Sequence, residues 1–100
     1  MDKKRNKLEI IRDMLLVIRS KNGRIKPTQI LYKSNLSHIM MKDYLSQLIK
    51  KGFIKEIKTE TGRTYSITNL GNKYLEEYNT VINFMDSFGL SEQVEKEEVF

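Results

Sequence analysis

The first fifth of the chain carries apolar residues at intervals of three and four, which is typical of an amphipathic helix. Two adjacent stripes are formed by Leu8, Ile11, Leu15 and Ile18 and by Ile10, Met14 and Val17. The pattern predicts a helix over about residues 6–20 that is buried on more than one side. Asn22 and Gly23 are suitable residues to end it.

Two shorter helices are predicted next. Pro27 stands in the first turn of a helix that reaches about Ser34, where its missing N–H group does no harm. After a turn over residues 35–37, Ser37 is a natural N-cap for a third helix from His38 to about Lys51. Met41, Leu45 and Leu48 form the inward side of that helix, and Gly52 ends it.

Beyond Gly52 the apolar period changes from that of a helix to that of a strand. Residues 53–58 and 63–67 are predicted strands, and residues 59–62 are predicted to be a polar hairpin turn in which Gly62 can take a positive φ.

A long last helix is predicted from Thr68 or Asn69 to about residue 88. Its apolar residues alternate in steps of four and three, as in a coiled coil. We expect this side to bind a second copy of the chain, and a small-molecule pocket is the alternative that we do not expect. The expected dimerisation residues are Tyr74, Leu75, Tyr78, Val81, Ile82, Met85 and Phe88.

The order of three helices, a hairpin and a long helix predicts an α+β, mostly α fold, the winged helix-turn-helix with a C-terminal dimerisation helix. Residues 1–67 would form the DNA-binding domain with a basic N-terminal arm, and residues 68–88 the coiled-coil helix. Residues 89–100 would be an acidic, mobile tail.

Charge agrees with a polyanionic partner. The net charge is +5, and residues 91–100 contribute −3, so residues 1–90 carry +8. Such a chain is attracted to nucleic acid, although basic charge also serves solubility. There is no cysteine and a single histidine, His38. No apolar run approaches the roughly 20 residues needed to span a bilayer. No glycine motif for binding phosphate and no cluster of metal ligands occurs either. We therefore expect no metal, no cofactor, no enzyme activity and no membrane association, in a cytoplasmic, nucleoid-associated protein.

Several segments resemble a known family. They are the segment Lys7–Ile11, the turn Tyr32–Ser37, the stretch from Tyr44 through Leu48 to Ile54, and Tyr65–Thr68 leading into Leu70 and Gly71. The chain is similar here to the small archaeal winged-helix DNA-binding proteins that dimerise through an antiparallel coiled coil. The resemblance implies such a dimer and no enzyme activity. The acidic tail and the Ile39–Met40 pair depart from the family pattern.

The predicted partner is double-stranded DNA, with the third helix in the major groove and the wing on the flanking backbone. The alternative is that these polar residues form only a solvated surface, and strand lysines also guard against aggregation. The expected DNA contacts are Ser37, His38, Lys42, Ser46, Gln47 and Lys50 on the third helix, Lys55, Lys58 and Arg63 on the wing, and Lys3, Lys4 and Arg5 on the arm.

Three residues of the third helix are not among the expected DNA contacts. Asp43 would repel phosphate, so we expect it to pair with Lys42 or to face the protein. Ile39 and Met40 are expected to pack on the neighbouring helix, and a contact with a thymine methyl is the alternative.

The chain would act as a chromosome-organising protein or a transcription regulator. The competing hypothesis is a protein-interaction module anchored by Ile39 and Met40.

Overall fold

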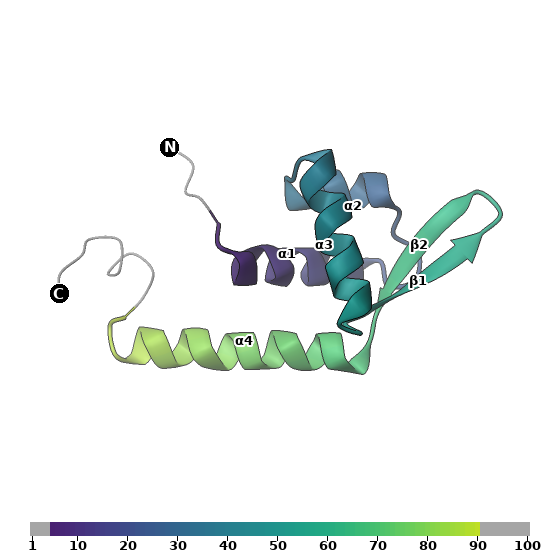
Figure 1. Ribbon diagram of the computed structural model, residues 1–100. Coiled ribbons are helices and arrows are strands. Elements are labelled where there is room, and N and C mark those ends of the chain that lie inside the picture. Colours follow the sequence, from purple (N-terminus) through teal and green to yellow (C-terminus); the bar gives the residue numbers. More distant parts are fainter. Residues whose placement is uncertain (1–4, 91–100) are drawn as a thin grey trace.

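The structure is a computed structural model that describes residues 5–90. The elements follow the predicted order along the chain (Figure 1). They are α1 (Lys7–Ser20), α2 (Pro27–Ser34), α3 (His38–Lys50), β1 (Ile54–Thr59), β2 (Gly62–Ile67) and α4 (Asn69–Ser87). The predicted winged-helix fold, mostly α with a hairpin wing, is confirmed.

Helix α1 lies at the centre of the core. Asn6 caps it by accepting a hydrogen bond from the Glu9 N–H, and the Glu9 side chain accepts one from the Asn6 N–H in return. Both predicted stripes of α1 contribute buried residues, and α2, α3, the wing and α4 add the rest. The core consists of Ile10, Ile11, Met14, Leu15, Ile18, Ile25, Ile30, Met41, Leu45, Leu48, Ile54, Tyr65 and Leu75.

The turn between α2 and α3 determines the direction of α3. Asn35 ends α2 in the left-handed conformation with φ 54°, which asparagine tolerates better than most residues. Ser37 then caps α3, as predicted, because its hydroxyl accepts a hydrogen bond from the Met40 N–H. The core residues of α3 hold its inner side, which leaves the opposite side at the surface.

The register of the wing places its side chains on two faces. Glu56 lies opposite Tyr65 and Lys58 opposite Arg63, so these four residues share one face. Lys55 and Ile57 alternate with them and point to the other face. At its second edge β2 forms a bridge between Tyr65 and Ile25, which attaches the wing to the segment before α2.

Helix α4 starts within the core and then leaves it. Thr68 caps its N-terminus, and Gly71 lies so close to the Phe53 carbonyl oxygen that an added Cβ would collide with it. Leu75 is 4% exposed and belongs to the core. This corrects its expected place in a dimer interface: the heptad spacing of Leu75 serves packing within its own chain.

Beyond Tyr78, α4 extends past the start of α1 as an arm (Figure 1), and the molecule is 54 Å long and 21 Å thin. We call residues 5–78 the head and residues 79–88 the distal segment. Within residues 5–90, no helix combines the length and apolar character that crossing a membrane requires.

Candidate nucleic-acid interface

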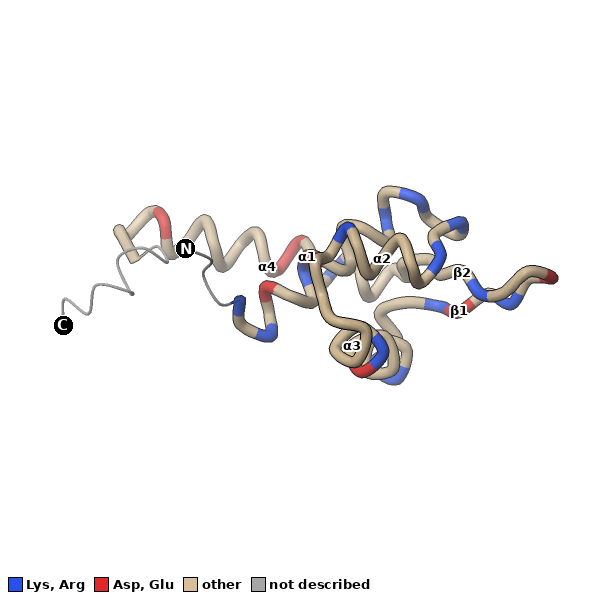
Figure 2. The backbone as a smooth tube through the Cα atoms, turned by 90° about the horizontal axis from the view of Figure 1, so that it is seen from above, with Lys and Arg blue, Asp and Glu red and all other residues tan. Residues whose placement is uncertain are grey.

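The outer side of α3 lies at the edge of the head, next to the projecting wing (Figure 2). Met41, Leu45 and Leu48 are buried beneath it. The predicted contact residues His38, Lys42, Ser46 and Lys50 are all exposed. The structure therefore brings polar and cationic side chains together on one accessible side of a helix, which is the arrangement that reading a DNA groove requires.

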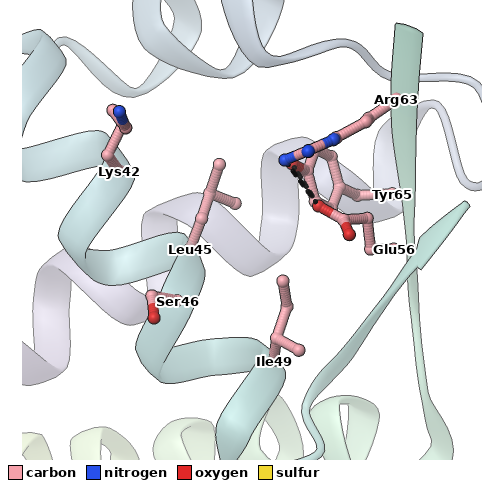
Figure 3. Close-up of a pocket in the computed structure, with 7 residues that line it drawn as sticks. All are labelled: Lys42, Leu45, Ser46, Ile49, Glu56, Arg63 and Tyr65. Atoms are coloured by element: carbon pink, nitrogen blue, oxygen red, sulfur yellow. Dashed lines mark hydrogen bonds and ion pairs between the residues drawn. The ribbon is translucent and has the colours of Figure 1, made fainter. Parts of the chain in front are cut away.

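A groove of about 260 Å³ separates α3 from the wing (Figure 3). Lys42 stands on the α3 wall, and Arg63 extends from β2 toward α3. A cation on each wall makes the groove attractive to a phosphate-bearing strand. The lining residues are Lys42, Leu45, Ser46, Ile49, Glu56, Arg63 and Tyr65.

Glu56 lies beside Arg63 at the edge of the groove. The Arg63 guanidinium lies 3.4 Å from Glu56 Oε2, and the Tyr65 hydroxyl donates to the same oxygen at 3.3 Å. Burial, followed by the charge of Glu56, raises the pKa of the Tyr65 hydroxyl, so it remains a proton donor. Because the Arg63 side chain is 60% exposed, this ion pair is weak and leaves the guanidinium open to phosphate.

Glu56 and Tyr65 also line the groove, although neither was predicted from the sequence as part of the site. The hairpin register contains the signal, because closing the turn between Thr59 and Gly62 places Glu56 opposite Tyr65 and diagonal to Arg63.

Two predicted contact residues of α3 already have partners. The Ser37 hydroxyl accepts the Met40 N–H at 3.2 Å, although its own proton can still be donated. The Gln47 amide donates to Asp43 Oδ2 at 3.0 Å, one helical turn away. The expected pairing of Asp43 with Lys42 or its burial is therefore wrong, since Asp43 is exposed and bound to Gln47.

The basic residues of the wing and arm separate into different places. Lys58 shares the face of Arg63, whereas Lys55 lies on the opposite face of the wing. Arg5 donates to Asp13 at 2.7 Å and to the carbonyl oxygens of Ser34 and Asn35. It joins the start of the chain to the end of α2, which corrects its expected role in a free phosphate-binding arm. Lys3 and Lys4 lie outside the described residues, as do residues 91–100.

The expected packing of Ile39 is also wrong. Its side chain is 80% exposed and that of Met40 is 40% exposed. The reason is local: the core side of α3 begins with Met41, and Ile39 in the first turn points away from it.

Apolar side chains cover one side of the distal segment. Val81, Phe84 and Phe88 are 54%, 59% and 67% exposed, and the rings of Phe84 and Phe88 lie 4.9 Å apart. Their spacing of three and four places them on one face. Ile82 and Met85 beside them are half-buried. Phe84 was missed because the predicted heptad stepped from Val81 to Met85, one position along.

The two tyrosines of the predicted heptad face α1. The Tyr74 hydroxyl donates to the Leu8 carbonyl oxygen at 2.9 Å, and burial raises the pKa of Tyr74 to about 12. Tyr78 lies beneath the Arg12 guanidinium, 5.0 Å from its ring centre. Both side chains therefore help to attach α4 to α1.

Among residues 5–90, no three acidic, histidine or cysteine side chains come together in a way that could hold a metal ion.

Three helices with an attached hairpin and a cation-lined groove between the last of these helices and the hairpin define a winged helix-turn-helix protein. The winged helix-turn-helix family matches residues 4–86, and the chain belongs to it. This family is non-enzymatic, so the prediction that the chain is not an enzyme is confirmed.

Comparisons with individual proteins agree with the predicted resemblance to small archaeal winged-helix proteins. The uncharacterised protein MJ0287 of Methanocaldococcus jannaschii is 32% identical over 84 residues, covering 84% of this chain and 80% of the relative. The fold is similar to that of Sso10a-2, a DNA-binding protein from Sulfolobus solfataricus, with a TM-score of 0.74 at 20% identity over 96% of this chain and 98% of that one. It is also similar to MepR, a transcription regulator of the Staphylococcus aureus efflux pump MepA, with a TM-score of 0.67 at 17% identity over 89% and 70% of the two chains.

Proposed function

We propose that the chain is a homodimer that binds double-stranded DNA, with α3 in the major groove and the wing on the flanking backbone. The observation that carries the proposal is the groove with Lys42 on one wall and Arg63 on the other. A DNA strand passing along this groove places its phosphates between the two cations while α3 reaches the base edges.

The neighbouring side chains support this orientation. Lys50 continues the basic side of α3, and Lys58 stands beside Arg63 on the same face of the wing. Ser46 and His38 are exposed and can donate to bases or phosphates. Lys55 is left out of the proposed contact surface because the register directs it away from α3.

The distal segment supports the homodimer. Val81, Phe84 and Phe88 would stay in water in a single chain, and burying them against a second copy is favourable. We infer an antiparallel pair of α4 helices, in agreement with the resemblance found in the sequence. Each α4 has 19 residues, or about 28 Å at about 1.5 Å per residue. Such a pair carries its two heads at opposite ends, so they either bind one duplex or bridge two.

The cellular role that we propose is chromosome organisation or transcription regulation, at the nucleoid. Arginine is the commonest reader of guanine, and α3 has none among residues 38–50. This favours binding that depends mainly on phosphate contacts. Among the proteins of similar fold, Sso10a-2 is a DNA-binding protein and MepR is a transcription regulator.

Fluorescence anisotropy of a labelled duplex, titrated with the chain at several salt concentrations, tests the proposal. With Lys42, Lys50, Lys58 and Arg63 from each of two heads, the slope of log K against log salt should approach about −7. Light scattering on the same samples should give twice the chain mass of 11.8 kDa. Absence of binding at low salt would overturn the DNA proposal, and a monomer at tens of micromolar would overturn the dimer.

A protein-interaction module is the second candidate, and the exposure of Ile39 is the observation that favours it. In that case the basic groove would have no role in binding. The same titration separates the two functions, because a protein-interaction module shows no salt-dependent affinity for DNA.

A further inference from the structure

Ile39 lies on the side of α3 that borders the groove. It precedes Lys42 by three residues and Ser46 by seven, so the three side chains follow one line along the helix. Lys42 and Ser46 both line the groove, and Ile39 continues their line into the first turn of α3. The first turn of a recognition helix is the part that reaches base edges in winged and related helix-turn-helix proteins.

An isoleucine at this place is exposed at a cost. At 80% exposure it loses the free energy that burial would supply, although core positions lie within one turn. Its neighbours one turn along α3, Lys42 and Asp43, are both exposed. The apolar surface that Ile39 and the partly exposed Met40 offer together is far smaller than the roughly 800 Å² that each partner buries in a standard protein complex. A small apolar group of the ligand fits better than a protein surface.

Among the groups in the major groove of DNA, one is apolar, the 5-methyl group of thymine. We propose that Ile39 is a specificity-determining residue that packs on a thymine methyl and favours A·T base pairs under the first turn of α3. The inference rests on the proposed DNA-binding function. Lys42 would hold the adjacent phosphate while Ile39 reads the base.

Two duplexes that differ only in this methyl group test the inference. One is an alternating A·T duplex, in which every register presents thymine, and the other has deoxyuridine in place of every thymidine. Affinities of the full chain are measured by anisotropy at fixed salt. Wild type should bind the thymine duplex about fourfold more tightly for each head that makes the contact, as expected for burying one methyl group.

Ile39→Ala should bring the ratio of the two affinities close to one while the salt dependence stays unchanged. Ile57→Ala is the matched control, since it makes the same change at a 38% exposed residue on the face of the wing that points away from α3. It should keep the wild-type ratio. Circular dichroism verifies that both variants are folded, and Ile39→Val supplies a milder second variant with an intermediate ratio.

Equal affinity of wild type for the two duplexes, or an unchanged ratio in Ile39→Ala, would overturn the thymine contact and leave DNA binding standing. Failure of wild type to bind either duplex would overturn both proposals. Both proposals would also be overturned if the chain bound no DNA and Ile39→Ala abolished its binding to a protein partner, because Ile39 would then anchor a protein.

Discussion

Two surfaces of the molecule are exposed, yet their chemistry is opposite. One is the distal segment of α4. The other, which we call the α3–wing face, combines the outer side of α3 with the adjoining face of the wing and carries Lys42, Ser46, Lys50, Lys58 and Arg63. The α3–wing face gathers cations, and its acidic residues Asp43 and Glu56 are each bound to a neighbouring side chain. The distal segment has an apolar side, and its one charged residue is the acidic Asp86. A polyanion is therefore drawn to the first surface. Under our proposal, the second surface binds another copy of the chain. The difference teaches that DNA binding can be disrupted without disrupting the proposed dimer.

The largest effect is expected from a charge introduced into the apolar side of the distal segment. Val81→Asp places a carboxylate beside Phe84 and Phe88, so the dimer should dissociate to monomers. DNA affinity should then fall by about 100-fold, because two linked heads no longer bind together. Light scattering measures the mass, and anisotropy measures the affinity.

Asn83→Asp is the control for that change. It adds the same carboxylate to an exposed position of the distal segment, on the side opposite the apolar one. It should leave the dimer intact and reduce DNA affinity only slightly. A monomer in both variants, or a dimer in both, would contradict the assignment of this surface.

The start of α4, which connects the wing to the distal segment, has no room for a larger side chain at Gly71. Gly71→Ala places a methyl group against the Phe53 carbonyl oxygen and the Ile67 side chain, so the start of α4 must shift. We expect a loss of about 1–3 kcal/mol in the free energy of unfolding. Urea unfolding measures it, and Asn79→Ala at an exposed position of the same helix should change little. An unchanged midpoint for Gly71→Ala would contradict the close packing.

A smaller effect is expected from residues 91–100, which lie outside the described residues and carry a charge of −3. Acidic residues compete with DNA for a basic surface, so deleting them should tighten non-specific binding by a few-fold and steepen its salt slope. Equal affinities of the full and shortened chains at low salt would show that these residues do not reach the α3–wing face.

The smallest effect concerns alkaline pH. The pKa of Tyr74 is raised from 10.0 to about 12 in the folded chain, so the folded state retains a proton that the unfolded state has released between these values. Stability should therefore fall as pH rises from about 10 to about 12. Tyr74→Phe, which has no proton to release, should show a shallower decline in thermal melting. A parallel decline in the two proteins would argue against the raised pKa of Tyr74.

The elements could be predicted because their signals are local. The caps Asn6, Ser37 and Thr68 and the turn residue Asn35 act within a few positions of themselves. The predicted helix ends differ from the observed ones by one residue or so. The change of period after Gly52 likewise revealed the wing without knowledge of the rest of the fold.

The errors concern contacts between residues far apart in the chain. Apolar spacing shows that Leu75 needs burial, but it does not show whether its own head or a second copy supplies the partner. Arg5 meets Ser34 across 29 positions, and no local pattern reports such a pair. Ile39 was expected to pack on the neighbouring helix, but it is exposed, because periodicity does not show whether another element covers a residue outside the core side of its helix.

A pair of charge reversals tests the central claim, that the α3–wing groove is the DNA-binding surface, most directly. Lys42→Glu with Arg63→Glu reverses both walls, while Lys55→Glu with Lys73→Glu makes the same change of charge on the far face of the wing and on α4. Anisotropy on one duplex at one salt concentration should show binding abolished in the first variant and retained, with a modest loss, in the second. Both should remain folded dimers. Retention of DNA binding by the folded Lys42→Glu/Arg63→Glu variant would show that the DNA-binding surface lies elsewhere.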